Sequence, residues 1–118
     1  QYITAVFFFA KLMKIFKRKI EVIWIMDENV LQDKISEAVL LLYQNKEQEA
    51  MQQVKELIVM FQNMIQNQTI EHMEEIGNFA ILMQRELLEN YQSLDMIGIA
   101  DCLTEKAVLF MKFYFQNK

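Results

Sequence analysis

The chain has 118 residues, a length typical of one domain that can bury a hydrophobic core without disulfides or metal ions. It contains no proline and only two glycines, Gly77 and Gly98, so the residues that usually break sheets and form tight turns are nearly absent, and an all-α fold is expected. The net charge of −4 gives no general argument for nucleic-acid binding, and no apolar run reaches the ~18 residues of a membrane-spanning helix.

Residues 1–25 form an N-terminal segment that differs from the rest of the chain. Five basic residues against one acidic residue give the segment a net charge of +4, whereas residues 26–118 have a net charge of −8. The segment is also strongly apolar and aromatic, as in the run from Tyr2 to Ala10. This break in composition separates the segment from a helical domain over residues 26–118.

Three interpretations of the N-terminal segment are open. It could be an added first helix whose basic residues face an acidic surface of the bundle. It could lie on a membrane surface, as basic and aromatic-rich stretches do. It could also be non-native, because Ile20-Glu21-Val22-Ile23 can be encoded by a stretch that resembles a bacterial ribosome-binding site, with Met26 as the start.

Two helices are expected in the first half of the domain. The first follows Asp27, a suitable N-cap, and ends near Tyr43, before a turn at Asn45-Lys46. Its apolar stripe is Leu31, Ile35, Ala38, Val39 and Leu42. The second helix ends in the polar cluster that begins at Asn63. Its stripe is Met51, Val54, Ile58, Phe61 and Ile65, widened by Ala50, Leu57 and Met64, and Met60 falls off it as a candidate exposed anchor.

Two more helices are expected in the second half. The third begins near Thr69, breaks at Asn90-Tyr91-Gln92 and has the stripe Met73, Ile76, Ala80, Met83 and Leu87, with Phe79, Leu82 and Leu88 beside it. The fourth has Ser93 as its expected cap. Its core face is Met96, Ala100, Leu103, Ala107, Phe110 and Tyr114, beside a second apolar strip of Ile97, Val108, Met111 and Phe115. Short connections between these helices predict an up-and-down antiparallel four-helix bundle, with an extra helix if the N-terminal segment adds one.

The sequence offers little catalytic chemistry. His72 is the only histidine, so the paired Glu-x-x-His steps of a di-iron bundle cannot be formed, and its neighbouring glutamates suit a solvated first helical turn. Cys102 is the only cysteine, which rules out an intrachain disulfide and favours a reducing cytoplasm. No cationic neighbour in the sequence would activate it, and buried free cysteine behaves as a small apolar residue. We therefore expect no enzyme, no cofactor and no metal site.

Part of the chain resembles a small all-helical family of unknown function from Firmicutes. The similar stretches are Ala38–Ala50, Val54–Ile58, Glu86–Asn90 and Asp95–Leu103, and the resemblance covers most of residues 27–108. It implies a bacterial helical protein. The family has no established activity, so the resemblance implies no functional residue.

We expect a small cytoplasmic protein-interaction module without small-molecule substrate or nucleic-acid partner, acting in the manner of an adaptor or chaperone. It would bind a partner helix, or a second copy of itself, through an aromatic surface on the last helix. That surface consists of Phe110, Met111, Phe113, Tyr114 and Phe115. The alternative is a membrane-associated helical protein, similar to bacteriocin-immunity bundles, that uses residues 1–25 on an acidic membrane surface.

Overall fold

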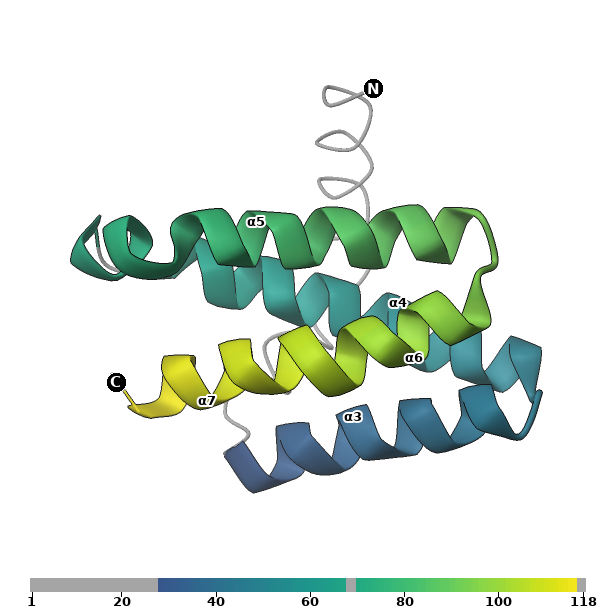
Figure 1. Cartoon of the computed structure of the whole chain (residues 1–118). Coiled ribbons are helices and arrows are strands. Elements are labelled where there is room, and N and C mark those ends of the chain that lie inside the picture. Colours follow the sequence, from purple (N-terminus) through teal and green to yellow (C-terminus); the bar gives the residue numbers. More distant parts are fainter. Residues whose placement is uncertain (1–27, 68–69, 117–118) are drawn as a thin grey trace.

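The computed structural model describes residues 28–67 and 70–116, except for the side chains of 70–73 and 75. The N-terminal segment, and with it the expected extra helix, lies outside the described residues. The described chain forms helices α3 (Glu28–Tyr43), α4 (Glu47–Gln66), α5 (Ile70–Gln92), α6 (Met96–Cys102) and α7 (Val108–Gln116), with a π-helical turn η1 (Leu103–Ala107) joining α6 to α7 (Figure 1). This part of the chain contains no strand. The expected all-α class is confirmed.

The helices form an antiparallel four-helix bundle in which α6, η1 and α7 together make the fourth rod. Each helix packs against the next one in the chain, and α3 also packs against α6, η1 and α7, which closes the bundle. The turns α3–α4 and α5–α6 lie at the same end of the bundle (Figure 1). The first helix, α3, and the fourth rod are far apart in sequence but lie side by side in the bundle.

The core follows the predicted apolar stripes closely in α3. All five of its predicted residues are buried, and they are the only buried residues of that helix. At the centre of the bundle, Phe61 of α4 meets Phe110 of α7 edge to face, with ring centroids 6.1 Å apart and an interplanar angle of 88°. Neither side chain is exposed to solvent. This pair joins helices that lie diagonally across the bundle.

Three predictions about burial are wrong. Met60 was expected as an exposed anchor, but it is buried in the contiguous core. Leu82 was placed beside the α5 stripe, but it is 55% exposed, because it lies two residues from the buried Ala80 and so on the opposite side of the helix. The second strip of the fourth rod is also not uniformly covered, because Ile97 at its start is 72% exposed while Met111 is fully buried.

The two turns at the shared end of the bundle have the same backbone design. Asn45 and Leu94 both have positive φ, 59° and 57°. After each of them the next N–H donates to a carbonyl five residues back, Lys46 to Leu41 and Asp95 to Asn90. This is the Schellman pattern of helix ends. The turn expected at Asn45-Lys46 is confirmed.

The expected cap of the fourth helix is wrong by two residues. The Ser93 hydroxyl donates to the Asn90 carbonyl and so belongs to the end of α5. The N-cap is Asp95, whose carboxylate accepts a 2.9 Å hydrogen bond from the Gly98 N–H. A Cβ on Gly98 would lie 2.5 Å from an Asp95 carboxylate oxygen, so glycine leaves the space that this cap occupies. Ser93 could not cap because the Schellman turn needs the two residues that follow it.

Candidate functional site

The predicted contact surface on the last helix is mostly inside the bundle. Phe110 and Met111 are not exposed at all, and Tyr114 is 5% exposed. Phe113 and Phe115 are half-buried, and Phe115 packs edge to face against Tyr114 at 5.2 Å. The aromatic density that suggested a binding surface therefore serves to hold α7 in the core. A partner could reach three of these five side chains only if α7 left the bundle.

An open apolar groove lies instead between α3 and the fourth rod. Its volume is about 330 Å³. It is lined by Ile35, Ser36, Val39, Leu40, Tyr43, Thr104 and Val108. Ile35 and Val39 are buried and form its floor, whereas Leu40 is 55% exposed and Tyr43 is 62% exposed at its edge.

Helical spacing explains the α3 side of the groove. Ser36, Leu40 and Tyr43 are four and three residues apart, so they form one row along the helix beside the core stripe. Two large apolar residues of this row, Leu40 and Tyr43, extend the apolar surface of the core towards the solvent. Both side chains are exposed at the edge of the groove.

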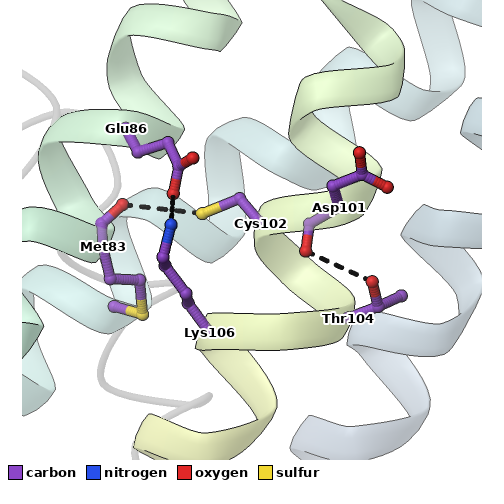
Figure 2. Close-up of polar contacts among 6 residues, drawn as sticks. All are labelled: Met83, Glu86, Asp101, Cys102, Thr104 and Lys106. Carbon is purple, nitrogen blue, oxygen red and sulfur yellow. Dashed lines mark hydrogen bonds and ion pairs between the residues drawn. The ribbon is translucent and has the colours of Figure 1, made fainter.

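The π-helical turn shapes the opposite side. In η1 the Val108 N–H donates to the Leu103 carbonyl, a step of five residues in place of four. Thr104 and Val108, at the start of this turn and just after it, are the two groove residues of the fourth rod. The Thr104 hydroxyl donates to the backbone carbonyls of Ala100 (3.0 Å) and Asp101 (3.2 Å; Figure 2). With its hydroxyl satisfied by the backbone, Thr104 can offer its methyl group to the groove.

Charged residues flank the groove on both helices. Asp33 is three residues before Ser36 and seven before Leu40, which places it on the same row of α3. Asp101 is three residues before Thr104, and Lys112 is four residues after Val108. All three charged side chains are exposed. The rim is therefore mainly acidic, with one basic residue, Lys112, in the middle of α7.

Cys102 is held as a buried thiol. Its S–H donates to the Met83 carbonyl across the α5–α6 contact, with the sulfur 3.7 Å from the oxygen, and Lys106 pairs with Glu86 beside it (Figure 2). Burial, and next the Glu86 carboxylate, raise the pKa of Cys102 to about 12. Only the thiolate is a nucleophile or metal ligand, so these surroundings suppress both roles at neutral pH.

Metal and membrane sites can be assessed only for the part of the chain that the structure describes. There, no group of three or more histidine, cysteine, aspartate or glutamate residues is arranged to hold a metal ion. The His72 side chain is outside that part. Within the same residues, none of the helices has the length and apolar character needed to cross a membrane.

No family model, curated protein or solved structure matches this chain. The resemblance to the Firmicutes helical family therefore stays a prediction.

Sequence reasoning missed the groove because the groove needs two helices that are distant in the chain. Leu40 and Tyr43 did carry a signal, since both are large apolar residues outside the predicted stripe of α3. Nothing in the sequence indicated that Thr104 and Val108 would lie opposite them. The π-helical turn was not expected either.

Proposed function

We propose that the protein is a non-catalytic interaction module that binds one amphipathic helix of a partner protein in the groove between α3 and the fourth rod. The partner helix presents an apolar face to the groove and basic residues to its rim. The observation that supports this most directly is the row of exposed apolar side chains, Leu40 and Tyr43, at the edge of a groove with a buried apolar floor. Helix-in-groove recognition uses this combination of an apolar channel and flanking charge.

The π-helical turn also supports a binding role for this surface. π-Helical turns are rare in helices and occur frequently at functional sites. Here η1 supplies Thr104 to the groove and immediately precedes Val108.

Charge defines the partner's chemistry. Asp33 and Asp101 flank the groove from opposite helices, and residues 26–118 carry a net charge of −8. Complementary charges accelerate association and set orientation more than they add affinity. A basic partner helix is therefore favoured over an acidic one, with its one acidic position beside Lys112.

The proposal is tested by calorimetric titration with two synthetic amphipathic helices. Both have leucines on one face, and the other face carries lysines in one peptide and glutamates in the other. The lysine peptide is expected to bind more tightly than the glutamate peptide. Leu40→Asp should weaken its binding at least about tenfold, because covering the exposed half of a leucine contributes about 1 kcal/mol and a carboxylate in its place must be desolvated.

The matched control is Ile81→Asp, since Ile81 is also an exposed aliphatic residue, at 42%, but lies on α5 away from the groove. This variant should bind the lysine peptide within about twofold of the unmodified chain. Equal affinities of the Leu40 and Ile81 variants would overturn the proposal, because the peptide would then be attracted by charge alone.

A further inference from the structure

Part of the outer face of α4, which points away from the bundle core, is buried although no helix of the described bundle packs there. Val59 lies two residues from Leu57 and two from Phe61, both of which face the core. At 3.6 residues per turn, two residues rotate the side chain to about 160° from each of them, so Val59 points away from the core. Even so, it is 2% exposed, and it is not part of the contiguous core cluster.

Asn63 extends this covered face by one helical turn. It lies four residues after Val59 on the same side of α4, and it is 9% exposed. Its buried side-chain Nδ2 has no hydrogen-bond acceptor within the described part of the chain. An unsatisfied buried donor costs about 1–3 kcal/mol. A segment that covers this face is therefore expected to bring an acceptor for the Asn63 amide.

The covered face is short. Gln52 is seven residues before Val59 and Gln66 is seven after it, so both lie on the same side of α4, and both are exposed. Whatever covers Val59 and Asn63 therefore crosses α4 locally instead of following its whole length.

The connectivity of the bundle places the start of α3 at this level. The α3–α4 turn is tight, and both helices advance 1.5 Å per residue, so Glu28, fifteen residues before Tyr43, lies about level with Gln62 of α4. Trp24 is four residues before Glu28 and is tethered within about 14 Å of it. A segment held this close has a high effective concentration at the outer face of α4.

We infer that the N-terminal segment, residues 1–25, docks on the outer face of α4 at Val59 and Asn63. The segment supplies apolar side chains to Val59 and an acceptor to the Asn63 amide, and its charge of +4 complements the −8 of the remaining chain. This contact is independent of the α3 groove and uses a different side of the molecule.

Trp24, the only tryptophan, reports on this contact in the full chain. Its emission should be blue-shifted and protected from acrylamide. Val59→Asp should shift the emission to the red and remove the protection, because a carboxylate cannot be buried there. Leu82→Asp is the matched control, since Leu82 is an exposed aliphatic residue of α5, and it should leave the emission unchanged.

A second measurement leaves Val59 intact, in case the aspartate variant fails to fold. A nitroxide on Gln66→Cys, which is exposed on the outer side of α4, should quench Trp24 more strongly than a nitroxide on Leu82→Cys. The native Cys102 is buried and does not compete for the label. Solvent-exposed emission in the unmodified chain, or equal quenching from both labels, would overturn the inference. Protection that disappears on dilution would also overturn it, because a second copy would then be the occupant.

Discussion

Raising the pH is expected to weaken the fold through Cys102. The thiol has an ordinary pKa of 9.0, and in the folded chain burial and then the neighbouring Glu86 carboxylate raise this pKa to about 12. The folded state therefore binds the thiol proton more tightly than the unfolded state does. The resulting stabilisation is complete below pH 9 and is lost as the pH rises from about 9 towards 12.

The size of the effect follows from these two values. At about pH 10.5 the unfolded thiol is mostly ionised and the folded thiol is still protonated, so the free energy of unfolding should have fallen by about 2 kcal/mol relative to pH 8. The perturbation that isolates this effect is Cys102→Ala, which removes the titrating group. The alanine variant loses some packing at every pH, but it should lack the 2 kcal/mol of pH dependence.

The assay is urea unfolding of both chains at pH 8 and about pH 10.5, with a reductant present to keep the thiol free. Burial also raises the pKa of Tyr91, and Glu86 raises the pKa of Lys106, but both groups are present in both chains. The comparison therefore removes most of their contribution. Parallel losses of stability in the two chains would refute the account of Cys102 as a thiol held protonated by burial.

Three further substitutions test the described structure by chemical unfolding. Asp95→Ala should cost about 1 kcal/mol because it removes the cap on the Gly98 N–H, whereas Asp95→Asn should keep most of that stability; equal losses would contradict the capping role. Phe61→Ala should cost about 3–5 kcal/mol because it leaves a cavity against Phe110, and a loss below about 1 kcal/mol would show that this pair is not at the centre of the core. Gln84→Met should be neutral or stabilising by about 1 kcal/mol, because it removes a buried Oε1 that has no donor among the described residues, at the expense of the Nε2 hydrogen bonds to the Ile58 carbonyl and, at 3.5 Å, to Gln62 Oε1; a loss of more than about 1 kcal/mol would contradict this balance.

The sequence carried enough information for the bundle because apolar periodicity is a local property. In α3 the predicted stripe and the buried residues coincide, from Leu31 to Leu42. The prediction failed at Met60, which lies beside the stripe and is nevertheless part of the contiguous core. Val59 was not singled out at all, because the helical period marks only the face that points to the core. Contacts on another face depend on what lies beside the helix, and no local pattern encodes them.

The candidate site was less predictable than the fold. Density of aromatic residues drew attention to Phe110 and Tyr114, but a large aromatic side chain suits a bundle core as well as an interface, and both residues are buried. The groove depends on α3 lying beside the fourth rod and on the π-helical turn that brings Thr104 to it. Periodicity alone cannot distinguish five-residue from four-residue hydrogen bonding over a single turn.

The position of the binding surface can be measured directly by an NMR titration of the isotope-labelled full chain with the lysine-faced helical peptide. We predict that the largest backbone amide shifts fall on Ile35–Tyr43 of α3 and on Thr104–Val108 of the fourth rod, the two stretches that line the groove. Shifts centred on the exposed side of α5 around Ile81 and Leu82, or spread evenly over every acidic residue, would contradict binding in the groove between α3 and the fourth rod.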